Sequence, residues 1–191
     1  MTTANKITLA RIALIPFFIW FATRWTPPGD AIALVLFCVA SVTDFLDGYV
    51  ARKYNQVTDF GKFVDPLADK LLVTAALVIF VERGLFAGWM VFVILAREFI
   101  ITSLRNIAAA KGQVMAAAWS GKVKTCVQIA VIIAIFLFSI VTGMGTPLPA
   151  VLPYACAWVA TLVTIYSGYD YMHRNWELVA QGATKPKRSG R

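Results

Sequence analysis

Four aspartates share one short stretch of an otherwise apolar chain with four small or basic residues. They are Asp44, Asp47, Gly48, Ala51, Arg52, Gly61, Asp65 and Asp69. Carboxylates inside an apolar helix are costly singly and repel one another when grouped. Mg²⁺ or Mn²⁺ prefers such oxygen ligands, and two ions about 4 Å apart would offset four negative charges. The stretch therefore predicts a two-metal site for phosphoryl transfer. The alternative is a purely structural network in which Arg52, Lys62 and Lys70 neutralise the four carboxylates.

The helical period groups these residues. The aspartates form two pairs, three and four residues apart in the sequence, and each pair shares one face of a helix. Gly48 and Ala51 continue the first face, and Gly61 belongs to the second. Small residues leave a helix surface bare for close packing or for a flat ligand. With Arg52 available to a phosphate, we interpret this surface as the wall of a nucleotide pocket.

The composition places this stretch in a membrane. Hydrophobic residues make up 59% of the chain, charged residues 15%, and the mean hydropathy is +0.71. The formal charge is +8, and the basic residues flank apolar runs, which favours anionic lipid headgroups over nucleic acid as the partner. Cys38, Cys126 and Cys156 lie in apolar runs without metal-ligand spacing and are interpreted as reduced core residues.

An all-α, polytopic membrane protein with six transmembrane helices is therefore expected, because a helix needs about 20 apolar residues to cross the bilayer. The expected spans are Ile7–Thr23, Ala31–Asp47, Phe63–Val81, Leu85–Leu104, Ala118–Thr142 and Val151–Tyr171. Short segments of residues typical of loops separate these spans. They are Pro27–Asp30, Asn55–Thr58, Arg83–Gly84, Lys111–Gly112 and Gly143–Pro149. Pro16 is expected to kink the first span without ending it.

Charge sets the expected orientation. With both termini in the cytoplasm, Arg24 and Arg83 are the basic residues left on the outer side, as the positive-inside rule requires. The aspartates then lie near the cytoplasmic surface of the cell membrane. Residues 1–180 are expected to form one domain and residues 181–191 a basic, disordered tail.

The spacing D-x(2)-D-G-x(2)-A-R-x(8)-G-x(3)-D-x(3)-D resembles the signature of the CDP-alcohol phosphatidyltransferase family, with every position present. The resemblance implies that an alcohol attacks the β-phosphoryl group of a CDP-linked lipid and that CMP leaves. It assigns Asp44, Asp47 and Asp65 as the principal metal ligands, and Asp69 as a ligand or neighbour of the metals that also acts as the general base. Asp47, Gly48, Ala51, Arg52 and Gly61 would line the CDP site. The family further suggests a six-helix fold, two Mg²⁺ or Mn²⁺ ions and a homodimer.

Basic residues elsewhere suggest the acceptor. Arg97 and Arg105 lie near one face of the fourth span, and Lys122 and Lys124 begin the fifth. We expect a socket for an anionic group such as a phosphate, because Arg105, Lys122 and Lys124 have few acidic partners nearby. An internal salt bridge between Arg97 and its neighbour Glu98 is the alternative.

The local sequences Ala-Arg-Glu-Phe, Ser-Leu-Arg and Gly-Lys-Val-Lys-Thr resemble a bacterial branch of the family that joins CDP-diacylglycerol to sn-glycerol 3-phosphate. Asn5, Thr8 and Arg11 resemble the opening of that branch. This implies that Asn5 and Thr8 approach the nucleotide and Arg11 the acceptor phosphate, although an N-cap would explain Asn5 equally well.

The sequence is also compatible with other functions. The same chemistry could use phosphatidylglycerol or inositol phosphate as the acceptor. A divalent-cation transporter would also need acidic ligands, but nearer mid-membrane and with repeated halves. A structural scaffold would leave the four aspartates unexplained. His173 is interpreted as an interfacial residue without a catalytic role.

Overall fold

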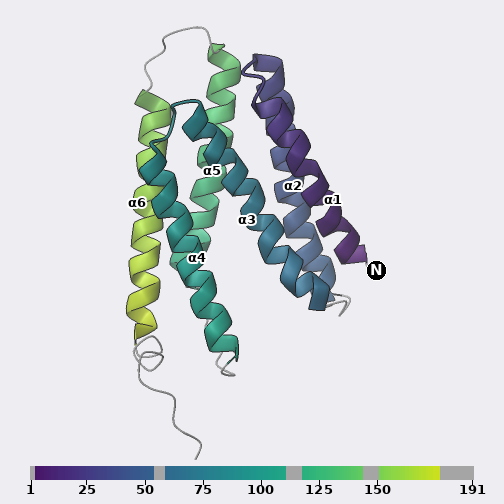
Figure 1. Cartoon of the computed structure of the whole chain (residues 1–191), viewed down its shortest axis with the longest axis vertical. Coiled ribbons are helices and arrows are strands. Elements are labelled where there is room, and N and C mark those ends of the chain that lie inside the picture. The colour runs from purple at the N-terminus through teal and green to yellow at the C-terminus, as the bar shows by residue number, and fades with distance from the viewer. Residues whose placement is uncertain (1–2, 54–58, 111–117, 144–150, 177–191) are drawn as a thin grey trace, which may run out of the picture.

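The fold is an all-helical bundle. A computed structural model describes residues 3–53, 59–110, 118–143 and 151–176. Its helices are α1 (Thr3–Ala22), α2 (Pro27–Lys53), α3 (Asp59–Glu82), α4 (Gly88–Ala110), α5 (Trp119–Thr142) and α6 (Val151–Arg174). They alternate in direction, so α1 begins and α6 ends at the same end of the bundle (Figure 1). The prediction of an all-α chain with six helices is confirmed, and the described residues contain no strand.

Several helices extend beyond the predicted spans, and two of the predicted breaks differ from the structure. Pro27 to Asp30 was expected to be a loop, but these residues form the first turn of α2. Proline is tolerated in a first turn because its missing N–H has no intrahelical partner there. The predicted break at Arg83–Gly84 is present, and Gly84 has a φ of 71°, but α4 begins at Gly88, after the predicted Leu85.

Three other predicted breaks fall wholly or mainly outside the described residues. They are Asn55–Thr58, Lys111–Gly112 and the part of Gly143–Pro149 that follows Gly143. Gly143 itself caps α5 with a φ of 59°, and its N–H donates to the Ser139 carbonyl oxygen. Pro16 lies inside α1, which continues past it as predicted.

Four phenylalanines hold one half of the bundle together. Phe18, Phe37, Phe80 and Phe136 come from α1, α2, α3 and α5, and all four are fully buried. The ring of Phe18 lies 6.0 Å from that of Phe37 and 5.9 Å from that of Phe136, and Phe80 lies 5.3 Å from Phe136. Each large ring buries enough apolar area to dominate local packing. The core therefore joins α1, α2, α3 and α5.

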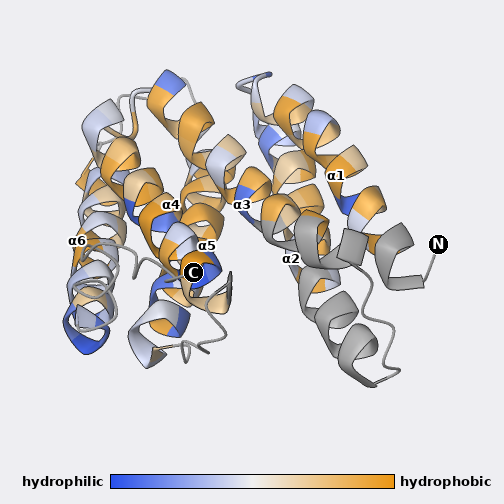
Figure 2. Cartoon of the chain, turned by 60° about the horizontal axis from the view of Figure 1, so that its bottom comes forward, coloured by the Kyte–Doolittle hydropathy of each residue, from blue (hydrophilic) through white to orange (hydrophobic). Residues whose placement is uncertain are grey.

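The outer surface of the bundle is apolar. Figure 2 shows hydrophobic residues along the helices, and Phe92 and Val141 are 72% and 83% exposed. By length and composition, α5 and α6 can each cross a membrane, whereas the apolar stretches described in α1 and α2 are shorter, at Ile7–Ala22 and Pro27–Thr43. An apolar exterior of this extent fits contact with lipid. The molecule therefore has the surface of a membrane protein.

The three cysteines are free thiols. Cys38 and Cys156 are half-buried, but Cys126 is exposed. The prediction of a core position is thus wrong for Cys126, because its side of α5 faces outward.

Candidate active site

The aspartate motif is divided between two antiparallel helices. Its first five residues lie in the second half of α2, and the last three lie in the first half of α3. Residues 54–58 separate the two helices, so the end of α2 and the start of α3 lie at the same end of the bundle (Figure 1). The fold thus places the two halves of the motif at one end of the molecule.

The side chains of all eight motif residues lie outside the described set, as does that of Asn5. Their distances from one another, and their predicted roles, therefore stay predictions. No group of three or more His, Cys, Asp or Glu side chains that could hold a metal occurs among the described side chains. Four carboxylates and no sulfur or imidazole form a donor set suited to a hard divalent cation.

Two predicted site residues on α1 face the interior. Thr8 is 2% exposed and Arg11 is 1% exposed, although both lie near the start of an apolar helix. Arg11 lies four residues before the buried Ile15 and Thr8 lies seven before it, so all three are on the same inward-facing side of α1. An arginine enclosed in this way is held for interaction with another protein group or a ligand, not for contact with lipid.

A three-residue ion cluster joins α4 to α5. Glu98 Oε1 accepts a hydrogen bond from Arg97 Nη1 at 3.0 Å and another from Lys124 Nζ at 2.5 Å. The side chains of Arg97, Glu98 and Lys124 are 12%, 20% and 6% exposed. One carboxylate thus serves two cations, and the cluster keeps a net charge of about +1 in a poorly solvated place.

The expectation that Lys124 lacks an acidic partner is wrong, because Glu98 reaches it across the helix interface. The alternative of a bridge between Arg97 and Glu98 is also present. Arg97 Nη2 donates to Ser167 Oγ at 2.7 Å, so this arginine also connects α4 to α6. Its Nε is buried and has no hydrogen-bond partner in the described structure. The cluster therefore retains a donor that a bound anion could use.

The remaining basic residues lie closer to the surface. Arg105 is exposed, and its Nε donates to the Tyr171 hydroxyl at 3.3 Å while its guanidinium lies 5.6 Å from the centre of that ring. Lys122 is exposed as well. The structure thus brings Arg97 and Lys124 together through Glu98, packs Arg105 of α4 against Tyr171 of α6, and leaves Lys122 outside this cluster.

A cavity of about 50 Å³ lies between α3, α4 and α5. This is enough room for several ordered waters. Its lining combines polar and apolar side chains. The lining residues are Lys70, Val73, Thr74, Leu77, Ile94, Leu95, Glu98, Phe99, Lys124, Thr125 and Gln128.

Hydrogen bonds connect the aspartate helix to the backbone of α4 at Glu98. Lys70, the residue after Asp69, donates from Nζ to Thr102 Oγ1. The Thr102 hydroxyl donates in turn to the Glu98 carbonyl oxygen at 2.7 Å. The sequence interpretation gave Lys70 only a neutralising role and did not assign Glu98 as a link. The available signal was a polar residue directly beside a motif aspartate in an apolar helix.

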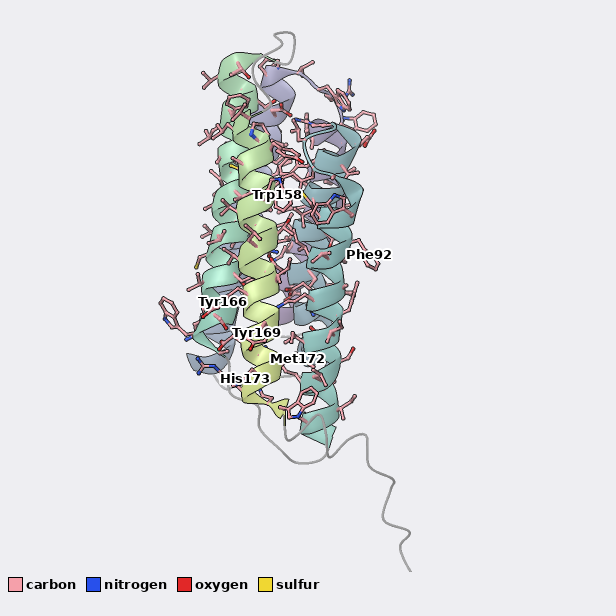
Figure 3. All side chains as sticks on the ribbon, turned by 90° about the vertical axis from the view of Figure 1, so that its left-hand side faces the viewer. Phe92, Trp158, Tyr166, Tyr169, Met172 and His173 are labelled. Carbon is pink, nitrogen blue, oxygen red and sulfur yellow. The ribbon has the colours of Figure 1, made fainter. Side chains whose placement is uncertain are left out.

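The lower end of α6 carries exposed polar aromatic groups (Figure 3). Tyr166 and Tyr169 are 65% and 69% exposed, and the His173 ring lies 6.0 Å from that of Tyr169. Aromatic side chains with polar tips gather at membrane–water boundaries. This position agrees with the interpretation of His173 as an interfacial residue.

Comparison with known proteins gives a consistent picture. The family model described as CDP-alcohol phosphatidyltransferase matches residues 1–166. A Bacillus subtilis (strain 168) protein named CDP-diacylglycerol--glycerol-3-phosphate 3-phosphatidyltransferase is 46% identical over 187 residues, covering 91% of this chain and 94% of its own length.

Proteins of the same name occur in Rickettsia bellii and Escherichia coli K12. The first is 36% identical and covers 87% of this chain and 91% of its own length. The second is 44% identical over 131 residues, which are 64% of this chain and 69% of its own length. The family match covers all of α1 to α5 and most of α6, including the complete aspartate motif. The chain belongs to the CDP-alcohol phosphatidyltransferase family.

Proposed function

We propose that this protein transfers the phosphatidyl group of CDP-diacylglycerol to sn-glycerol 3-phosphate, giving phosphatidylglycerophosphate and CMP. The relatives described above carry the name of this activity. The observation that carries the proposal is the family match over residues 1–166, which includes the complete aspartate motif, together with the 46% identity to the Bacillus subtilis relative. The structure adds a cavity lined by Lys70, the residue beside the proposed base Asp69, and by Lys124 and Glu98 of the basic cluster.

The reaction exchanges one phosphorus–oxygen bond for another. The primary hydroxyl oxygen of glycerol 3-phosphate bonds to the β-phosphorus, and the bond from that phosphorus to CMP breaks. Asp69 accepts the hydroxyl proton, since a carboxylate in reach of the nucleophile is a suitable general base. Bound Mg²⁺ or Mn²⁺, held by Asp44, Asp47, Asp65 and Asp69, would supply charge stabilisation for the pyrophosphate.

The nucleotide and the acceptor use different surfaces in this proposal. Asp47, Gly48, Ala51, Arg52 and Gly61 hold the CDP group, with Asn5 and Thr8 beside it. The acceptor phosphate binds Arg97 and Lys124, where Glu98 keeps both cations in place. Arg105, Lys122 and Arg11 complete the acceptor set. Charge-assisted hydrogen bonds to a phosphate are the strongest that such a site can offer.

The proposed topology is six transmembrane helices with both termini and the active site facing the cytoplasm of the bacterial cell. The alternating helix directions support it, as does the common end shared by the start of α1 and the end of α6 (Figure 1). The distribution of Lys and Arg supports the same orientation. We further propose one domain over residues 1–180, a basic tail over 181–191, two metal ions per site and a homodimer.

CMP release tests the proposal. Purified protein in detergent is given CDP-diacylglycerol and Mg²⁺, with glycerol 3-phosphate, phosphatidylglycerol or inositol phosphate in parallel. The expected result is release with glycerol 3-phosphate alone, and no release from Asp69→Asn. Release with another acceptor would overturn the assignment of the acceptor site. If no acceptor leads to CMP release, the proposed activity is wrong, and a divalent-cation transporter becomes the favoured function.

A further inference from the structure

A fully buried ion pair lies at the end of the bundle opposite the aspartate motif. Asp30 is in the first turn of α2, and Arg83 follows the last residue of α3. Arg83 Nη1 donates to Asp30 Oδ2 at 3.0 Å, and Nη2 donates to Oδ1 at 2.5 Å. Both side chains are 0% exposed. Two parallel bonds between a guanidinium and a carboxylate fix the relative position of the two groups as well as their distance.

Two more helices bind the same pair. Ser139 Oγ of α5 donates to Asp30 Oδ2 at 2.5 Å, and Arg83 Nη2 also donates to the carbonyl oxygen of Ala22, the last residue of α1. The Arg83 guanidinium lies 5.7 Å from the centre of the Phe136 ring, within the phenylalanine core described above. The ion pair thus joins the ends of the four helices that share this core.

The pair is equally far from the two halves of the motif along the chain. Asp44 follows Asp30 by fourteen residues on α2, and Asp69 precedes Arg83 by fourteen residues, all but the last of them on α3. At about 1.5 Å per helical residue, each interval spans roughly 21 Å. Holding Asp30 against Arg83 therefore brings Asp44 and Asp69 to the same level along the bundle.

The direct contact between α2 and α3 is limited, whereas α1 packs extensively against both. The axial register of α2 relative to α3 therefore depends mainly on contacts that each helix makes with other elements. A slip of one residue would move half of the motif by about 1.5 Å. Mg²⁺ demands near-ideal octahedral geometry at about 2.0–2.1 Å, and a functional constellation tolerates displacements of only about 0.5 Å.

We propose that Asp30 and Arg83 are positioning residues. They fix the axial register of α2 relative to α3 and thereby align the two halves of the divalent-metal site at the other end of the bundle. This inference rests on the metal site of the proposed function. A merely structural pair would stabilise the protein without changing the metal affinity of the molecules that remain folded. The two roles are therefore separable by measurement.

The test is Mn²⁺ binding to the full chain in detergent, followed by electron paramagnetic resonance of the free ion. Asp30→Asn keeps the shape of the side chain but removes its charge, and Arg83→Gln removes the guanidinium. Each is expected to raise the Mn²⁺ dissociation constant at least tenfold in protein that elutes as a single folded species. Raising the Mn²⁺ concentration should then restore most of the turnover rate.

The control is the double variant Asp170→Asn with Arg174→Gln, which removes a more exposed ion pair within α6. It should leave the Mn²⁺ dissociation constant within twofold of the unsubstituted protein. Ser139→Ala removes one hydrogen bond from Asp30 and should give a smaller increase in the same direction. It decides the test if the charge variants do not fold.

Three results would overturn the inference. The first is an unchanged Mn²⁺ dissociation constant in folded Asp30→Asn, or in Ser139→Ala when the charge variants do not fold. The second is an equal change in the α6 control. The third is a lack of Mn²⁺ binding by the unsubstituted protein. If that protein binds Mn²⁺ but releases no CMP, the proposed function fails, while a shift in Mn²⁺ affinity in the variants still supports positioning.

Discussion

Lys124 Nζ of α5 lies 2.5 Å from Glu98 Oε1 of α4, on the wall of the cavity that also contains Lys70. The lysine is 5% exposed, so its charge depends on this carboxylate for compensation. The same oxygen accepts a bond from Arg97 at 3.0 Å. The proposed acceptor site is thus a pair of cations whose positions are set by one acidic residue.

Replacing Glu98 with glutamine should reduce both stability and acceptor affinity. The loss of unfolding free energy should fall below the roughly 3–5 kcal/mol typical of a fully buried pair, since Glu98 is 20% exposed. The KM for glycerol 3-phosphate should rise at least tenfold, because Arg97 and Lys124 lose their common anchor. Thermal unfolding in detergent and steady-state CMP release measure the two effects.

A companion variant separates these effects. Adding Lys124→Met to Glu98→Gln removes an uncompensated cation, so part of the lost stability should return. The KM for the acceptor should stay high, because a phosphate ligand has been removed. Recovery of the acceptor KM in the double variant would exclude Lys124 as a phosphate ligand.

Asp69→Asn should abolish turnover while the protein still folds. Loss of a general base costs about 10²–10⁴-fold, and the side chain is also a proposed metal ligand, so the fall in kcat should reach at least 10³-fold. Asp170→Asn changes an acidic residue outside the motif and should keep kcat within twofold. Comparable losses in the two variants, measured by CMP release, would argue against a special role for Asp69.

Arg105→Ala should weaken the acceptor and spare the lipid donor. Arg105 is held on Tyr171 by a hydrogen bond of 3.3 Å and by contact with its ring. Losing one hydrogen bond to a charged group costs about 1.5–3 kcal/mol, or roughly 10–150-fold in KM for glycerol 3-phosphate. The KM for CDP-diacylglycerol should not change. Equal effects on both substrates would contradict an acceptor role.

Gly168 and Gly121 form a matched pair of positions near Arg97. A Cβ at Gly168 would lie 3.1 Å from Arg97 Cγ, whereas one at Gly121 would lie 3.9 Å from Arg97 Nη2. Alanine in a helix gains about 0.5–1 kcal/mol over glycine. Gly121→Ala should therefore raise the unfolding temperature in detergent, and Gly168→Ala should not, because Arg97 must shift. Equal stabilisation by both substitutions would show that Arg97 moves aside without cost.

The sequence by itself determined the features that depend on neighbours along the chain. Apolar runs of sufficient length indicated six helices, and the motif from Asp44 to Asp69 indicated the family. These predictions succeed because helix formation and helical faces follow local spacing. The Pro27 boundary was missed since a proline near an apolar run is compatible with either a loop or a first helical turn.

The tertiary structure decided which distant groups meet. Glu98 and Lys124 are 26 positions apart, and Asp30 and Arg83 are 53 apart. The sequence predicted Arg83 to lie on the outer side of the membrane but did not indicate that it is buried against Asp30. Such pairings depend on which helices are neighbours and how far each is displaced along its axis. Periodicity describes a single helix, and so neither the register of α2 against α3 nor the partner of Lys124 could follow from it.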